Sequence, residues 1–343
     1  MQQPEHTGVM SLTDIEATAH SIVANQLGDG MILWFPGGHA DPWNHVEAAM
    51  ALDVAGLRTE AERAYQWLAD AQKPDGWWHH YYLADGIEDP KIDTNVCAYV
   101  ATGVWHHWLC TGDRGYLETM WPVVERAIDF VLSMQRAGGE IIWARHADGT
   151  PWSYALLTGS SSIYHSLRCA LMLAQTMDVD RTDWEFSAVQ LAHAIAHDPH
   201  AFEPKERWAM DWYYPVLAGA IDGDAATHRL AAGRDTFVMD GRGVRCVSDQ
   251  PWVTAAETCE CAMAYLVAGQ RDEAKSLFEA VQVLRDDDGA YFTGIVYPDR
   301  INFPDAERST YTSAAVILAA DALDGHSPAA GIFRNEDLPD LTS

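Results

Sequence analysis

The chain has 343 residues, 48% of them hydrophobic, and its 50 acidic residues against 22 Lys and Arg give a formal net charge of −28. Such a field repels nucleic acid and anionic membranes, so we expect neither as a partner. No run of about 18 apolar residues predicts a membrane span, and the start "MQQPEHTGVMSLTD" lacks the pattern of a secretory signal. Dispersed cysteines without a CxxC pair favour reduced thiols and a cytoplasmic location.

Two kinds of helical pattern alternate along the chain, which indicates internal repetition. Amphipathic, charge-rich segments occupy residues 13–27, 59–73, 113–135, 182–197, 223–233 and 271–284. Segments that are apolar or small on nearly every side occupy residues 42–55, 94–110, 160–175, 211–221, 254–268 and 310–323. A helix that is apolar all round is buried, whereas an amphipathic one faces water. The alternation predicts an all-α (α/α)6 barrel, one domain over residues 1–343 with short flexible termini at about 1–10 and 326–343.

The connections between these helices differ in length. Links from inner to outer helices are short, as in "TGDR" and "AGQR", whereas links from outer to inner helices are mostly long and rich in aromatic residues and Gly. Short β-ribbons are expected within the long loops, for example in "AYFTGIVYP". The long loops therefore collect at the N-terminal ends of the inner helices, and a functional site is expected there.

The first turns of the inner helices supply carboxylates, amides, hydroxyls and aromatic rings. Sugar recognition uses this combination, because planar polar groups bind hydroxyls and aromatic faces cover the C–H face of the ring. The candidate substrate-binding residues are Trp43, His45, Glu47, Trp78, Asp93, Asn95, Tyr164, His165, Asp211, Trp212, Tyr214, Trp252, Glu260 and Tyr311. An oligosaccharide or polysaccharide is the expected substrate, and the sequence leaves open whether the chain forms a homodimer.

Two carboxyl groups across such a mouth would hydrolyse a glycosidic bond, with about 6.5–9.5 Å between them in an inverting enzyme. We favour Asp41 and Glu257 as the catalytic pair, with Asp93 and Asp211 in reserve. Asp41 and Asp93 have an alternative role as helix N-caps. Glu257 is harder to explain as a cap, because Thr254 suits that position and the helix is otherwise nearly apolar.

Histidine is plentiful, but no HExxH or similar spacing occurs, so neither a metal nor another cofactor is expected. A sugar isomerase or epimerase of the same barrel class is the second functional class. In that class His45 or His165 would move a proton.

The stretch "KIDTNVCAYVATGVWHHWLCTGDRGYLETMWPVVERAIDFVLSMQ" resembles the matching segment of glucoamylase- and trehalase-type glycosidases. The resemblance implies the six-hairpin barrel and a substrate-binding role for Asp93. It does not transfer the catalytic acids, because "EIIWAR" has Ala144 where those enzymes carry one acid and "AYFTGIVYP" offers no second one.

Two further resemblances point in different directions. The stretch "AYQWLADAQKPDGWW" resembles the QxxDGxW element of squalene cyclases and prenyltransferases, although the acidic DxDD motif is absent and the element can be purely structural. The stretches "WFPGGHADPWNHVEAAMAL", "LLTGSSSIYHSLRCALMLA" and "FPDAERSTYTSAAVILAADAL" are similar to actinobacterial hydrolases of methylmannose polysaccharides. That family implies endo action on α-1,4-linked 3-O-methylmannose units in the cytosol.

Overall fold

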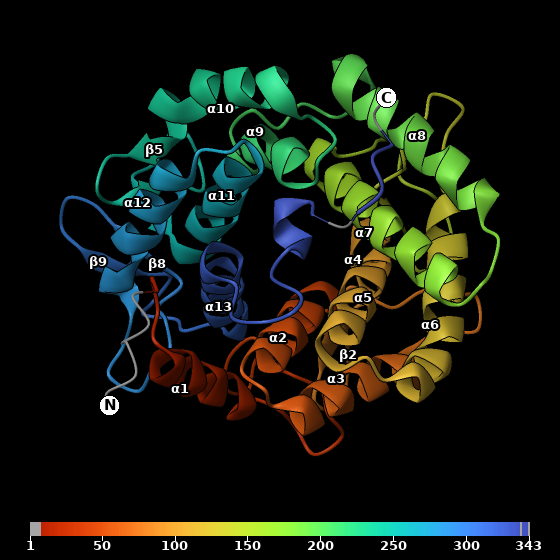
Figure 1. The fold of residues 1–343 in the computed structure, drawn as a ribbon, viewed down its shortest axis with the longest axis horizontal. Helices are drawn as coiled ribbons and strands as arrows, with labels where there is room; N and C mark the ends of the chain where they lie inside the picture. The colour runs from red at the N-terminus through yellow and green to blue at the C-terminus, as the bar shows by residue number, and fades with distance from the viewer. Residues whose placement is uncertain (1–7, 337, 342–343) are drawn as a thin grey trace, which may run out of the picture.

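A computed structural model describes residues 8–336 and 338–341, and helices dominate it (Figure 1). Each of the amphipathic segments forms a helix on the outside of a ring. Their buried residues lie along one stripe, as in α3, where Ala61, Ala64 and Leu68 face inward. The outer helices are α1 (Leu12–Val23), α3 (Arg58–Ala71), α6 (Arg114–Leu132), α8 (Thr182–His197), α10 (Gly223–Phe237) and α12 (Arg271–Val281).

The apolar segments form the inner helices of the ring. They are α2 (Pro42–Val54), α4 (Thr94–Ala98) with α5 (Val100–Thr111), α7 (Leu157–Thr176), α9 (Ala209–Leu217), α11 (Ala255–Val267) and α13 (Thr310–Asp324). Tyr99 keeps helical backbone angles between α4 and α5, so these two act as one interrupted inner helix. Successive inner helices pack against each other, and α13 packs against α2. The expected all-α architecture is confirmed.

Short antiparallel ribbons stiffen the loops that precede inner helices. The strands are β1 (Tyr81–Leu83), β2 (Gly86–Asp89), β3 (Ile92–Asp93), β4 (Ala144–Arg145), β5 (Val238–Met239), β6 (Gly243–Val244), β7 (Trp252–Thr254), β8 (Gly294–Val296) and β9 (Ile301–Phe303). They pair as β1–β2, β3–β4, β5–β6 and β7–β8–β9. The ribbon expected in "AYFTGIVYP" is present as β8.

A repeated turn ties neighbouring outer helices together. A glutamine near the end of an outer helix donates from Nε2 to the carbonyl of the glycine four residues later and to a carbonyl of the next outer helix. Each glycine has a positive φ, which favours glycine, and a Cβ there would lie 2.0–2.3 Å from a backbone oxygen. The pairs are Gln26 with Gly30, Gln72 with Gly76, and Gln135 with Gly139. The "QKPDGWW" element is therefore a structural turn.

The C-terminal segment enters the centre of the ring, where the short helix η3 (Ile332–Arg334) lies (blue in Figure 1). We expected flexible termini, but Ile332 and Phe333 are buried, and so is Met10 near the start. The remaining part of that expectation, residues 1–7, 337 and 342–343, lies outside the described residues. Two other short helices are η1 (Pro199–Ala201) and η2 (Gln282–Leu284). Over the described part of the chain, none of the helices has the length and apolar character of a membrane span.

Candidate active site

The N-termini of the inner helices and the long loops before them form one end of the ring, which we call the mouth. Asp41 caps α2 there, as its alternative role required: Oδ1 accepts from the backbone N–H groups of Trp43 (2.9 Å) and Asn44 (3.0 Å). Its Oδ2 accepts from the Trp34 indole and the Asn44 amide, both at 2.7 Å. Burial raises the pKa of Asp41, and these donors oppose that rise. Asp41 thus combines a cap with a desolvated carboxyl group at the mouth.

Asp93 repeats this arrangement at α4. Its Oδ1 accepts from the backbone N–H groups of Asn95 (3.0 Å) and Val96 (3.3 Å), and the Lys91 ammonium lies 3.9 Å from Oδ2. Burial raises the pKa of Asp93 to about 6, against the opposing effect of Lys91. Two adjacent inner helices therefore begin with buried carboxyl groups of similar geometry.

Tyr81 of β1 lies near both of these carboxyl groups. Burial, followed by the charges of Asp41 and Asp93, raises the pKa of its phenol to about 12. The His39 imidazole stacks on the Tyr81 ring at 4.2 Å, and its Nδ1 lies 2.9 Å from a carboxylate oxygen of Glu88. The sequence did not single out Tyr81, because its place over the mouth depends on the β1–β2 hairpin.

Glu257 lies in the first turn of α11 and remains partly exposed to solvent. Burial raises the pKa of its carboxyl group. The charge of Glu257 in turn raises the pKa of Glu260 one turn deeper. Glu257 is thus a carboxyl group at the mouth with few donors to hold it ionised.

A second layer of polar groups lies one turn below the mouth. In five inner helices the sixth residue past the N-cap points into this layer: Glu47, Tyr99, Ser162, Tyr214 and Glu260. The Tyr99 hydroxyl donates to Glu47, and Glu260 accepts from Tyr213 and, at 2.9 Å, from Tyr311. Burial raises the pKa of Glu47 to about 7, and burial with the Glu257 charge holds the pKa of Glu260 far above its usual range.

Trp43 joins the two layers. Its ring stacks on Tyr99 at 4.6 Å and meets Tyr311 edge-on at 5.4 Å, while its indole N–H donates to Ser162 at 3.3 Å. The structure therefore brings together Trp43 and four other predicted residues, Glu47, Tyr214, Glu260 and Tyr311. Tyr99, Tyr213 and Ser162 complete this cluster and were not among the candidate substrate-binding residues.

Two predicted residues, His45 and Trp78, instead point into the protein. The His45 Nε2–H donates to the Ala64 carbonyl at 2.8 Å, and Nδ1 accepts from the Ile32 N–H at 3.1 Å. Trp78 is fully buried, and its indole donates to the Leu68 carbonyl at 2.9 Å. Both side chains donate hydrogen bonds to backbone carbonyls of α3, so the structure places neither of them at the mouth.

Three more predicted residues face other parts of the fold. Trp212 stacks on Phe237 at 5.4 Å and donates to a backbone carbonyl of α10. His165 stacks on Phe333 at 5.6 Å and meets a backbone carbonyl of η3. Tyr164 is buried, and an arginine that binds the C-terminal segment lies over its ring. His165 and Tyr164 therefore support the C-terminal segment.

The last three predicted residues stay near the mouth but outside the cluster. Asp211 accepts from the Thr158 hydroxyl at 2.6 Å, and burial raises its pKa. Trp252 stacks on Phe303 at 4.8 Å. Asn95 keeps a buried side-chain oxygen for which no hydrogen-bond partner exists among the described residues.

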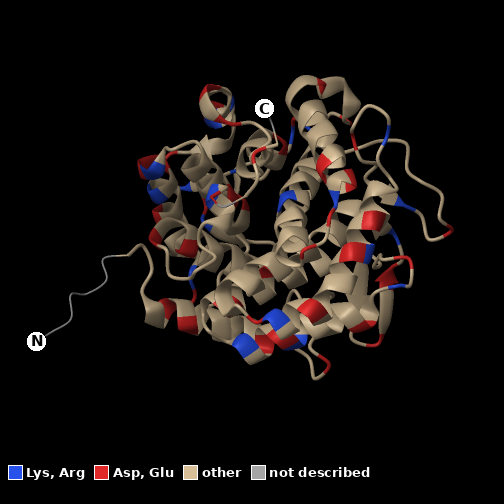
Figure 2. Ribbon diagram, turned by 45° about the vertical axis from the view of Figure 1, so that its right-hand side comes forward, with Lys and Arg blue, Asp and Glu red and all other residues tan. Residues whose placement is uncertain are grey.

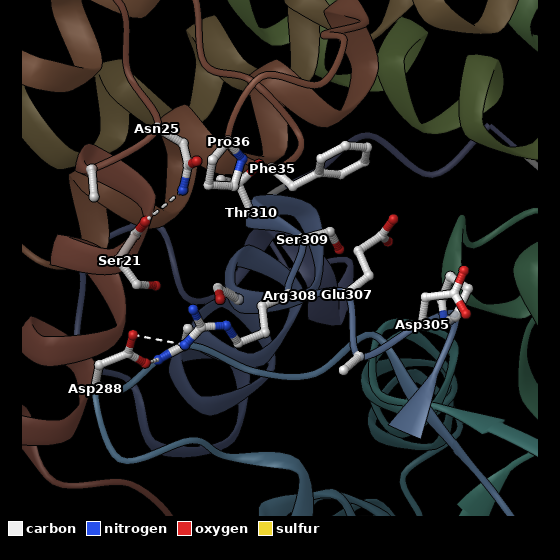
Figure 3. A pocket seen from close by; sticks show the side chains of 15 residues that line it. Ser21, Asn25, Phe35, Pro36, Asp288, Asp305, Glu307, Arg308, Ser309 and Thr310 are labelled. Carbon is white, nitrogen blue, oxygen red and sulfur yellow. Dashed lines mark hydrogen bonds and ion pairs between the residues drawn. The ribbon is translucent and has the colours of Figure 1, made fainter. Parts of the chain in front are cut away.

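Three hollows lie beside the mouth, each lined in part by residues that precede or begin an inner helix. One of about 730 Å³ contains Asp211, and one of about 580 Å³ contains Lys91. The third, of about 480 Å³, lies between the end of α1 and the start of α13 (Figure 3). There the Phe35 ring lies along one side, and Arg308 pairs with Asp288 at 2.7 Å on the other. No group of three or more His, Cys, Asp or Glu suited to a metal ion occurs in the described chain.

Comparison with known proteins gives two kinds of likeness. The chain is 52% identical over 336 residues to the MMP endo-(1,4)-3-O-methyl-α-D-mannosidase of Mycolicibacterium hassiacum, covering 98% of this chain and 93% of that protein. A solved wild-type glycosidase superposes with a TM-score of 0.70 at 14% identity, covering 92% of this chain and 98% of the other. A solved D-mannose isomerase gives 0.67 at 13% identity, covering 90% and 96%. No protein-family model matches the chain.

The fold and the carboxyl-lined mouth, taken with these likenesses, define a glycoside hydrolase of the all-α class. Within that class, the chain belongs to the family of the MMP endo-(1,4)-3-O-methyl-α-D-mannosidase. The two solved structures, both below 25% identity, support the fold alone.

Proposed function

We propose that this protein hydrolyses internal α-1,4 bonds of a polysaccharide built from 3-O-methylmannose. The observation that carries the proposal is the 52% identity, over nearly the whole chain, to the MMP endo-(1,4)-3-O-methyl-α-D-mannosidase. The site suits such a substrate, because aromatic rings and carboxyl groups lie together there, as in Tyr311, whose hydroxyl donates to Glu260 at 2.9 Å. We place the reaction in the cytoplasm, in keeping with six free cysteines.

The proposed fold is a closed (α/α)6 barrel. Its support is the series of contacts between successive inner helices, which returns from α13 to α2. Such a barrel places the first turns of all inner helices around one mouth, so that Asp41 and Glu257 face the same space from different helices.

We assign catalysis to Asp41 and Glu257 acting as base and acid in an inverting reaction. Asp41 accepts four hydrogen bonds, which stabilise its ionised form, so it is the base. Because both contacts at its Oδ2 come from side chains, one must move to admit water. Burial raises the pKa of Glu257, which favours its protonated form, so we assign Glu257 as the acid.

The test is hydrolysis of α-1,4-linked 3-O-methylmannose oligosaccharides, followed by mass spectrometry of the products. We expect Asp41→Asn and Glu257→Gln each to lower kcat by about 10²–10⁴-fold with folding retained. The control is Asp113→Asn, which alters the N-cap of α6 outside the mouth and should leave kcat unchanged. Full activity in either mouth variant removes that residue from the pair, and no cleavage by folded wild-type protein removes the proposed function.

Proton NMR of the fresh product tests the stereochemistry. Inversion of an α-linkage gives the β-anomer first, whereas retention gives the α-anomer. A first-formed α-anomer overturns the inverting assignment.

The isomerase alternative has less support from the site. The two histidines that would move its proton, His45 and His165, are buried and bonded to backbone carbonyls, and burial lowers the pKa of each to about 4. Conversion of free mannose to fructose by the protein would favour this alternative over hydrolysis.

A further inference from the structure

Three aromatic rings stand together beside the mouth, and we call Trp143, Trp152 and Tyr154 the aromatic wall. The Trp143 and Trp152 rings meet edge to face at 4.7 Å, and Tyr154 lies 5.7 Å from each of them. All three side chains are only partly buried, although rings of this size gain most when fully covered. The wall therefore keeps apolar surface available to a ligand.

Backbone pairing fixes the wall next to the N-terminus of α4. Strand β4 pairs with β3, so that Ala144 lies opposite Asp93. The Trp143 N–H donates to the Tyr154 carbonyl at 3.0 Å, and the Trp152 N–H donates to the Ala144 carbonyl at 2.9 Å. The wall is thus part of a short ribbon rather than a loose loop, which reduces the ordering entropy lost when a ligand binds.

Polar groups accompany the rings. The Lys91 ammonium lies 4.3 Å from the centre of the Trp143 ring and 3.9 Å from Asp93 Oδ2. The Trp152 indole nitrogen is buried and finds no acceptor within the described chain. Such a donor costs free energy unless a bound oxygen satisfies it.

The wall borders the hollow of about 580 Å³. Its lining residues are Asp89, Pro90, Lys91, His146, Ala147, Asp148 and Trp152. From there a line of side chains leads to the proposed reaction centre, because Lys91 lies between the Trp143 ring and Asp93, and Tyr81 lies near both Asp93 and Asp41. A chain bound at the reaction centre can extend along this line.

We propose that the aromatic wall is a remote subsite for a methylated sugar ring of the bound chain, separate from the rings at the cleaved bond. This inference rests on the proposed function. The O-methyl group adds apolar surface that suits indole faces, while Lys91 and Asp93 offer a donor and an acceptor to the remaining oxygens. The subsite lets the enzyme hold long chains in preference to short ones, as internal cleavage requires.

The test measures binding without turnover, by calorimetry on the Glu257→Gln protein with 3-O-methylmannose oligosaccharides of increasing length. Adding Trp152→Ala should weaken binding of the longest oligosaccharides by about tenfold, which is about 1.4 kcal/mol, and leave disaccharide binding unchanged. Trp152→Phe should restore most of the loss. Unmethylated α-1,4-mannose oligosaccharides should show a smaller loss.

The matched control is Phe186→Ala, which removes an exposed ring (64% exposed) from outer helix α8 and should change no affinity. Equal affinities for long chains with and without Trp152, or an equal loss at every length, overturn the subsite. If Trp152→Ala unfolds the protein, Lys91→Met gives the same comparison of lengths. If the wild-type protein hydrolyses the oligosaccharides and Trp152→Ala leaves their affinity unchanged, only the subsite is ruled out. If Trp152→Ala weakens the binding of long chains but the wild-type protein does not hydrolyse them, only the proposed function is ruled out.

Discussion

Glu47 of α2 and Asp41, which caps that helix, are both buried carboxyl groups, but their surroundings differ. Asp41 accepts four hydrogen bonds, including two from backbone N–H groups, whereas Glu47 accepts one from the Tyr99 hydroxyl. Burial consequently raises the pKa of Glu47 to about 7. At pH 5 the second layer of polar groups thus contains a neutral carboxyl group that can act as a hydrogen-bond donor.

Glu47→Gln should change how stability depends on pH. Because folding raises the pKa of Glu47 from 4.5 to about 7, its contribution to the free energy of unfolding is complete below pH 4.5 and is lost as pH rises through 7. The loss amounts to about 3 kcal/mol. The amide does not ionise, so the variant should match wild type at pH 4 and exceed it at pH 8.

Urea unfolding at both pH values measures this difference. Glu279→Gln, which changes an exposed glutamate of α12, should follow the wild-type curve. Parallel wild-type and Glu47→Gln curves between pH 4 and 8 would show that Glu47 ionises normally in the folded protein.

Part of the second layer of polar groups could be predicted from the residue types at the starts of the inner helices. These residue types indicated Glu47, Tyr214 and Glu260 but not Tyr99 and Ser162, since the spacing of six residues is visible only once each N-cap is known. The histidines were misplaced for another reason. A side chain that can bind a sugar hydroxyl binds a backbone carbonyl equally well, and only the packed structure decides between them.

At the scale of elements, the repeated Gln–Gly turn sets the spacing of the outer helices. Gly76 has a φ of +93°, and its Cα faces the Arg126 carbonyl so closely that a Cβ would lie 2.0 Å from the oxygen. Gln72 bonds to the same turn and to Val123 of α6. The turn therefore joins α3 to α6 through backbone contacts that no larger residue permits.

Gly76→Ala should destabilise the protein by about 2–5 kcal/mol, through backbone strain and the clash with α6. The matched control is Gly86→Ala in β2, where a Cβ meets nothing within 4 Å, and it should change stability by about 0.5 kcal/mol or less. Thermal and urea unfolding of the two variants give the comparison. Equal stability of both variants would mean that the turn moves away from α6 at little cost.

Every predicted helical segment coincides with a helix, because long apolar or amphipathic periodicity is a strong local signal. The C-terminal segment shows the limit of that signal. Residues 326–336 mix Gly, Ala and charged residues without a period, yet Phe333 packs on His165 and Arg168 bonds to Asn335. These contacts join residues far apart in the chain, so no local sequence pattern predicts them.

At the scale of the whole molecule, the acidic excess is spread over the surface. Figure 2 shows Asp and Glu on the outer helices and loops, with fewer Lys and Arg between them. The net charge of −28 therefore acts as a diffuse repulsion within the protein rather than as a binding patch. A neutral polysaccharide is not steered by this field, whereas an anionic ligand is repelled.

Added salt should therefore raise the stability of the protein and leave its catalytic efficiency nearly unchanged. Raising NaCl from about 0.05 to 0.5 M shortens the screening length well below 10 Å and weakens the self-repulsion, so the melting temperature should rise by about 1–3 °C. Over the same range kcat/KM on a methylated mannose oligosaccharide should change less than about twofold, because a neutral sugar has no charge to screen. Calorimetry and initial rates on the same samples give both quantities. A steep rise of kcat/KM with salt would indicate an anionic substrate and would contradict the neutral polysaccharide proposed for this mouth.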